Sequence, residues 1–235
     1  MGHVASVAVY ETLKALDLGV GVYHKHRLVN AVLDHPGPSW QRQLRRHLDD
    51  PQPGAPWHVV TLVRDPVARN LSSFFHNLGK TTYPAYRPEF ERGINLTAEE
   101  LRAHFVAHAD YEIDFAENWF DHEICHLFDV DVFSESFPHD AGFSVITGDR
   151  ARVLVLRMEA LAQSLPIAIE AFLGIPDVQL LSANRNRSET YRGFLEQATL
   201  PEDYVDRVYS SKLARHFYTP DELASFKVRW TRVPR

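Results

Sequence analysis

The sequence contains very little cysteine, with Cys125 alone among 235 residues. A single cysteine excludes a framework of disulfide bonds, and an isolated one is usually a small buried hydrophobe. The chain also lacks an apolar run of the roughly 18 residues that a membrane-spanning helix needs, and its first residues are not a basic segment followed by a long apolar one. We therefore expect a soluble cytoplasmic protein without a transmembrane segment.

An excess of positive charge is also absent. The chain carries 25 Lys and Arg against 31 Asp and Glu, a formal net charge of −6. This balance argues against nucleic acid or an anionic membrane as the partner, so any site for an anion has to be local. The Gly-Lys-Ser/Thr ending of a Walker A loop is missing as well, which argues against an ordinary NTPase.

The chain does contain short apolar runs that alternate with stretches of helical periodicity. We expect strands at 20–23, 58–63 and 153–156, helices at 7–16, 39–48, 66–78, 98–108, 112–128 and 158–173, a loop at 83–95, and three or four short helices in the tail 188–230. This alternation predicts one α/β domain over residues 1–235. Its sheet should be parallel, with four or five strands flanked by helices and 58–63 as a central strand.

Polar residues stand where the strand at 58–63 gives way to a helix. Arg64 ends the strand, Pro66 suits the first turn of a helix, and Ser72 follows Arg64 by eight residues. Ligands of parallel sheets bind where strands end, and arginine and a helix N-terminus both suit a phosphate. The pair is therefore a candidate anion site. In the alternative interpretation, Arg64 pairs with Asp65 or caps a neighbouring element, and Ser72 is merely exposed.

Two further candidates lie near the start of the chain. His24 and His26 flank a lysine after the expected strand at 20–23, where a histidine can act as a general base near neutral pH, although single histidines are more often surface or packing residues. Residues 2–6 precede a helix, as a phosphate-cradling loop would.

A competing motif is His122-Glu123-x-x-His126, which fits the H-E-x-x-H pattern of zinc proteases. Position 132, six residues beyond the second histidine, is a valine, and no glutamate stands at the usual ligand spacing. A chain with 13 histidines also produces such pairs by chance, as His104 and His108 illustrate. A zinc hydrolase is the less favoured alternative.

Taken with these motifs, the chain resembles the sulfotransferases that use 3′-phosphoadenosine 5′-phosphosulfate (PAPS). The Arg64…Ser72 pair is similar to their 3′-phosphate motif, and the stretch 153–161 is similar to their late strand with its R-x-E-x-L turn. Residues 184–194 and 209–230 resemble bacterial members assigned to capsular polysaccharide synthesis. The resemblance implies a P-loop-kinase-like fold and transfer of a sulfuryl group from PAPS to a hydroxyl, most simply of a saccharide, with no metal.

The resemblance also implies roles for single residues. Uronyl and heparan 2-O-sulfotransferases carry a His-x-His after the second strand, which matches His24 and His26 and makes His26 the expected base. Arg64 and Ser72 would hold the 3′-phosphate, with Arg187 from a late basic loop as an extra ligand. The 5′-phosphosulfate loop would comprise Gly2, His3, Val4, Ala5, Ser6, Val7 and Ala8.

This loop departs from the family pattern. The lysine that steadies the leaving phosphate is replaced by His3, and two later hydroxyl positions are Val7 and Ala8. The strand that should precede the loop is not found before Gly2, so we expect either that the start of the chain is placed too late or that this copy has lost part of its site. A degenerate, non-catalytic nucleotide-binding protein is therefore the second interpretation.

Overall fold

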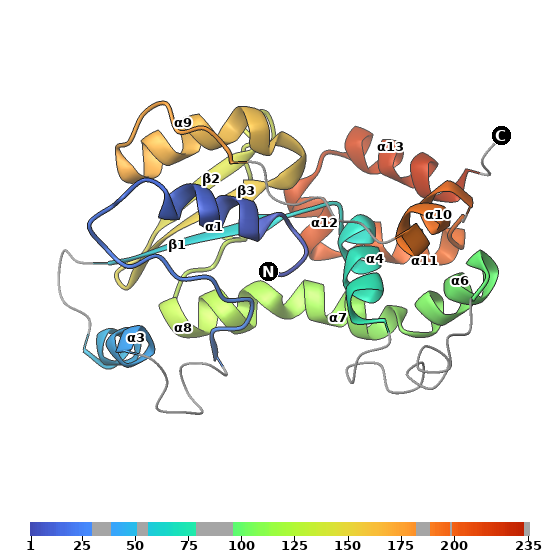
Figure 1. Cartoon of the computed structure of the whole chain (residues 1–235), viewed down its shortest axis with the longest axis horizontal. Helices are drawn as coiled ribbons and strands as arrows, with labels where there is room; N and C mark the ends of the chain where they lie inside the picture. The colour runs from blue at the N-terminus through green and yellow to red at the C-terminus, as the bar shows by residue number, and fades with distance from the viewer. Residues whose placement is uncertain (30–38, 51–55, 79–95, 182–188, 198, 233–235) are drawn as a thin grey trace. The chain divides into compact units, whose positions relative to one another are not determined.

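The computed structural model describes residues 1–29, 39–50, 56–78, 96–181, 189–197 and 199–232. The expected loop at 83–95 and Arg187 lie outside these residues. The chain forms two compact units: the first comprises Met1–Arg64 and Asn118–Asn184, and the second comprises Asp65–Glu117 and Arg185–Arg235 (Figure 1). The expectation of a single domain stays a prediction.

A three-stranded mixed sheet forms the centre of the first unit, in the order β1-β3-β2. β1 (Trp57–Val63) runs parallel to β3 (Ala151–Arg157). β2 (Phe143–Thr147) pairs with β3 in the antiparallel sense. Because β3 is the middle strand, its residues 153–156 are fully buried, which explains their unbroken apolar sequence.

The prediction of a parallel sheet with four or five strands is therefore wrong for the described residues, and so is the central position of the strand at 58–63. β2 was not predicted, although a Gly-Asp sequence before β3 is typical of a turn between two strands. In the structure this turn closes a hairpin, in which the Gly148 N–H donates to the Ala151 carbonyl at 2.9 Å. Residues 20–23 form no strand. Val20 is 72% exposed, and the ring of Tyr23 stacks on Trp40 instead of lying in a sheet.

Most helices of the first unit lie where the apolar periodicity predicts them. They are α1 (Ser6–Lys14), α3 (Ser39–Asp49), the end of α7 (Ala109–Phe120), a π-helical turn (Asp121–Cys125), α8 (His126–Phe128), a 3₁₀ turn (Met158–Ala160) and α9 (Leu161–Leu173). α9 packs against β2 and β3. The π turn interrupts the continuous α-helix expected at 112–128: the His126 N–H donates to the carbonyl of Asp121, five residues back.

The second unit is helical, which confirms the expected helices after Pro66 and in the tail. It contains α4 (Pro66–Asn77), α6 (Ala98–Ala107), most of α7, α10 (Glu189–Gln197), α11 (Glu202–Tyr209), α12 (Lys212–Phe217) and α13 (Pro220–Thr231). Local caps define several of these starts. Asp65 accepts the Val67 N–H before α4, and Thr97 and Thr219 form capping boxes before α6 and α13.

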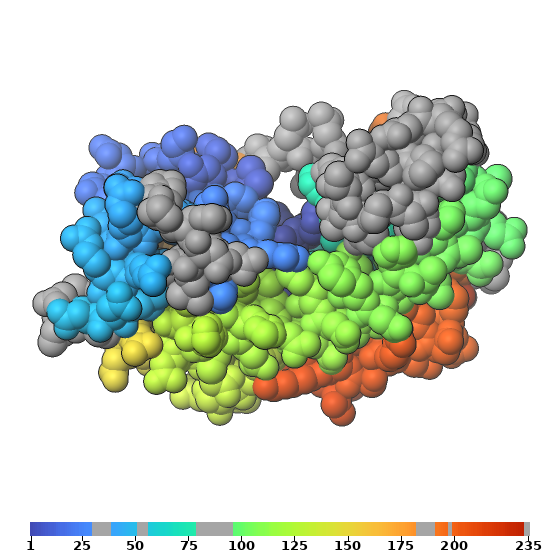
Figure 2. Space-filling view, turned by 90° about the horizontal axis from the view of Figure 1, so that it is seen from below, coloured from blue at the N-terminus to red at the C-terminus, as the bar shows by residue number. Residues whose placement is uncertain are grey.

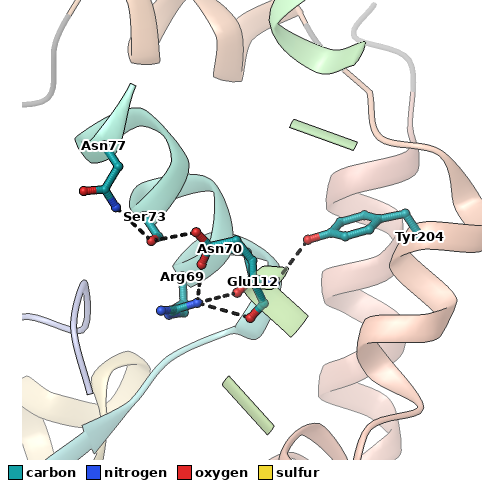
Figure 3. A network of polar contacts seen from close by, with 6 residues as sticks. All are labelled: Arg69, Asn70, Ser73, Asn77, Glu112 and Tyr204. Atoms are coloured by element: carbon teal, nitrogen blue, oxygen red, sulfur yellow. Dashed lines mark hydrogen bonds and ion pairs between the residues drawn. The ribbon is translucent and has the colours of Figure 1, made fainter. Parts of the chain in front are cut away.

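A buried polar network lies among the helices of the second unit (Figure 3). Arg69 of α4 and Glu112 of α7 form an ion pair of 2.6 Å, and the Ser73 hydroxyl donates to the same carboxylate at 3.0 Å. Asn70 donates to the Tyr204 hydroxyl of α11 at 3.2 Å. These contacts tie three helices together through one polar cluster.

Within the described part of the chain, no helix combines the length and the apolar character needed to cross a membrane.

Candidate functional site

The loop before α1 has an unusual backbone. His3 and Ala5 have φ angles of 65° and 62°, in the left-handed region that residues other than glycine rarely adopt. The Ala5 carbonyl accepts the Ala8 N–H at 3.0 Å and so closes the first turn of α1. The N–H groups of Ser6 and Val7 lie in this first turn, where a helix offers them no acceptor of its own. Loop and helix start therefore have the features of an anion site.

Apolar anchors hold the same loop against the first unit. Met1 and Val4 are buried at 6% and 0% exposure, whereas Val7 is 51% exposed on the outer side of α1. Met1 and Val4 thus anchor the loop to the core of the first unit.

His24 contacts the loop directly. Its Nε2 lies 3.0 Å from the Ser6 hydroxyl, and its ring stacks on Tyr10 of α1 with 5.5 Å between centroids. Burial lowers the pKa of His24 below 6.5, with smaller contributions from the positive charges of the Met1 α-amino group and Lys25. The His24 ring is consequently neutral at pH 7.

His26 lies beside both of these elements. Its ring meets that of His24 edge to face at 4.6 Å. A Cβ placed on Gly2 would lie 3.6 Å from the His26 ring, an ordinary van der Waals distance, so the ring faces the loop at Gly2. The His26 carbonyl accepts a hydrogen bond of 3.0 Å from the Trp119 indole. Both histidines of the His-x-His motif therefore lie against the predicted phosphosulfate loop.

Arg64, at the end of β1, also reaches this loop. Its Nη1 donates to the His3 carbonyl at 3.2 Å. The neighbouring Asp65 carboxylate accepts hydrogen bonds from Tyr209 and Trp230. Ser72 lies partly exposed on α4 of the second unit. The prediction that Arg64, Ser72 and the undescribed Arg187 share one phosphate stays a prediction.

A cavity of about 920 Å³ adjoins His24 within the first unit. Ser6, Tyr10 and His24 line one part of it, while β1 and the end of α9 contribute Trp57, Thr61 and Phe172. The Thr61 hydroxyl is buried without a hydrogen-bond partner. The cavity thus combines aromatic faces, scattered polar groups and access to the loop, which are common properties of small-molecule sites.

The H-E-x-x-H motif does not form a zinc centre in the described part of the chain, where no group of three or more His, Cys, Asp or Glu side chains is arranged to hold a metal ion. His122 and His126 are exposed, whereas Glu123 is buried and accepts the backbone N–H groups of Leu28 and Val29. This contact could not be predicted from the sequence, because it joins residues more than 90 positions apart.

Comparison with known protein families shows a match to the NKWYS family, described as "Putative capsular polysaccharide synthesis protein", over residues 91–219 of the 235. No curated protein and no solved structure matches the chain.

Proposed function

The chain belongs to the NKWYS family of capsular polysaccharide synthesis proteins, and from this premise we propose that it transfers a sulfuryl group from PAPS to a hydroxyl of a saccharide. The observation that carries the proposal is the convergence of His24, His26 and Arg64 on the loop at residues 2–8. A candidate base thus lies beside a candidate anion cradle, as transfer to a hydroxyl requires.

The reaction is an in-line displacement at sulfur. The acceptor oxygen forms a bond to sulfur while the bond from sulfur to the bridging phosphate oxygen breaks. The acceptor proton passes to His26, and the products are the sulfated saccharide and adenosine 3′,5′-bisphosphate. Atoms and charges balance without a metal, a reductant or an oxidant.

The neighbouring ring helps His26 to act as the base. Because burial keeps the pKa of His24 low, His24 is neutral and does not repel the positive charge that develops on His26. The contact with Ser6 and the stack on Tyr10 hold the His24 ring in place. His24 is thus a positioning residue in this proposal and the second choice for the base.

The loop binds the charge of the donor. The N–H groups of Ser6 and Val7 and the positive end of α1 stabilise the leaving phosphate. His3 supplies less charge than the lysine of the resembled family at pH 7, because a histidine is mostly neutral there. Arg64 and Ser72 hold the 3′-phosphate, with Arg187 as an additional ligand, and they position the donor without taking part in bond making. The acceptor sugar occupies the cavity beside His24, where aromatic faces offer stacking surfaces.

Two measurements on the full chain test the proposal. Calorimetry with adenosine 3′,5′-bisphosphate should show binding, and radiolabelled PAPS with a panel of saccharides should give a labelled product. His26→Ala should abolish transfer and leave nucleotide affinity near normal. Binding without transfer to any acceptor would favour the degenerate, non-catalytic alternative, and the absence of binding would refute both.

A further inference from the structure

Residues 24–28 carry both histidines of the candidate site, yet they belong to no helix or strand. Such a segment has no ladder of backbone hydrogen bonds to fix it. A side chain that acts on a substrate has to be held closely, because a displacement of about 1 Å can cost on the order of a hundredfold in rate. The contacts that replace a ladder here are therefore of functional interest.

Two buried side chains supply these contacts. The Trp119 indole donates to the His26 carbonyl at 3.0 Å, and the Glu123 carboxylate accepts the N–H groups of Leu28 and, at 3.0 Å, of Val29. Trp119 and Glu123 are 5% and 7% exposed. The backbone that carries His26 is thus held at the residue's own carbonyl and again at the two amides that follow Arg27.

Both anchors come from one place in the helical segment of residues 109–128. Glu123 lies within the π-helical turn, and Trp119 lies two residues before it. Single π turns are rare and occur often at functional sites. In Figure 2 the blue atoms of the first 29 residues lie beside the yellow-green atoms of residues 118–128, which belong to the same unit.

We infer that Glu123 is a positioning residue, which together with Trp119 fixes the backbone of residues 26–29 so that the His26 ring stays against the loop at Gly2. The glutamate of the H-E-x-x-H motif therefore serves as a backbone anchor, and its flanking histidines have no part in this role. A carboxylate is suited to the task because hydrogen bonds to a charged acceptor are stronger than those between neutral groups. The catalytic consequence rests on the proposed function, whereas the anchoring itself does not.

Hydrogen exchange on the full chain tests the anchoring without any assay of activity. Glu123→Ala should increase amide exchange at Leu28 and Val29 by roughly tenfold or more, because both amides lose their acceptor. Glu123→Gln should give a smaller increase, since an amide oxygen still accepts. His122→Ala is the matched control: it alters an exposed side chain of the same motif and should leave these amides unchanged.

Kinetics with PAPS then test the effect on transfer. Glu123→Ala should lower kcat by roughly tenfold to a hundredfold and change KM for PAPS by less than about twofold, because the donor is held by other residues. Glu123→Gln should recover part of kcat, and His122→Ala should match the unaltered protein. A merely structural role would impair KM and kcat together.

Several outcomes would overturn the inference. If amide exchange at Leu28 and Val29 is unchanged in Glu123→Ala, Glu123 is not a backbone anchor. If His122→Ala increases this exchange as much as Glu123→Ala does, the result would favour a metal centre at the motif. If the unaltered protein binds no nucleotide and transfers no sulfate, the proposed function fails, while the exchange experiment still decides the anchoring.

Discussion

Arg69 and Glu112 form an ion pair of 2.6 Å in the interior of the second unit, where the two side chains are 3% and 2% exposed (Figure 3). Removing one partner of such a pair leaves the other charge buried and uncompensated. Glu112→Ala should therefore lower the free energy of unfolding by about 3–5 kcal/mol. Urea denaturation followed by circular dichroism measures this loss.

An exposed ion pair of the same unit provides the control. Asp110 and Arg207 lie 2.7 Å apart, but their side chains are 82% and 52% exposed. Asp110→Ala should change the free energy of unfolding by no more than about 1 kcal/mol, because water and salt screen the pair. Equal losses in the two variants would contradict a special contribution from the buried pair.

Asp65 predicts a dependence of stability on pH. Burial raises the pKa of this carboxyl above 3.8, although hydrogen bonds from Trp230, Tyr209 and Val67 oppose the shift. Between the unfolded and the folded pKa, the folded state holds a proton that the unfolded state has released, so stability falls as the pH rises. Asp65→Asn removes this titration while it keeps an oxygen for the cap of α4.

The stability of Asp65→Asn relative to the unaltered protein should consequently increase as the pH rises from about 4 through the folded pKa of Asp65. Unfolding curves of both proteins at several pH values measure this difference. A difference that stays constant over the range would show that Asp65 has the same pKa in both states.

Local signals made the helices predictable. The helix after Asp65 and Pro66 has a cap, a proline at its first position and an apolar face, all of which depend on residues a few positions apart. The capping boxes at Thr97 and Thr219 are equally local. In these segments the secondary structure in the fold is the one that the local sequence favours.

Other features were missed or mistaken. β2 belongs to a local hairpin with β3 and was missed despite the Gly-Asp turn between them. Residues 20–23 form no strand, and Tyr23 stacks on Trp40 of α3, a contact between residues far apart in the sequence. In the candidate site, the motif at residues 24–26 was visible in the sequence, whereas the contacts of Trp119 and Glu123 with the same segment were not. Spacing alone could not distinguish a backbone anchor from the glutamate of a zinc site.

Arg64 is expected to affect both the proposed 3′-phosphate contact and the proposed phosphosulfate loop at residues 2–8. Arg64→Ala should weaken the binding of adenosine 3′,5′-bisphosphate by roughly tenfold to a hundredfold, which corresponds to the loss of a charged hydrogen bond. Such a loss could come from the 3′-phosphate contact or from the loop that Arg64 supports. Ser72→Ala separates these two causes, because it removes the proposed 3′-phosphate contact and leaves the hydrogen bond from Arg64 to the His3 carbonyl intact. Calorimetry measures both affinities.

A loss in Arg64→Ala with no loss in Ser72→Ala would assign Arg64 to the support of the loop alone. Losses in both variants would support the shared 3′-phosphate, and full affinity in both would refute the assignment.

The titration of His24 tests the electrostatics of the histidine pair. Burial lowers its pKa below 6.5, and the charges on Met1 and Lys25 add to the effect. NMR titration of the ring should therefore give a midpoint below 6.5 in the folded protein. Tyr10→Ala uncovers the ring and should raise this midpoint more than Lys25→Ala does, because burial is the larger cause.

The effect of His24 on the pH dependence of stability is opposite to that of Asp65. A lowered pKa means that the unfolded state takes up the proton first, so His24 contributes stability above pH 6.5 that is lost as the pH falls through the folded pKa. His24→Gln should reduce this loss on acidification. A midpoint at or above 6.5 would show that His24 carries a positive charge more readily than proposed, and it would remove the argument that a neutral His24 lets His26 accept the proton of the acceptor.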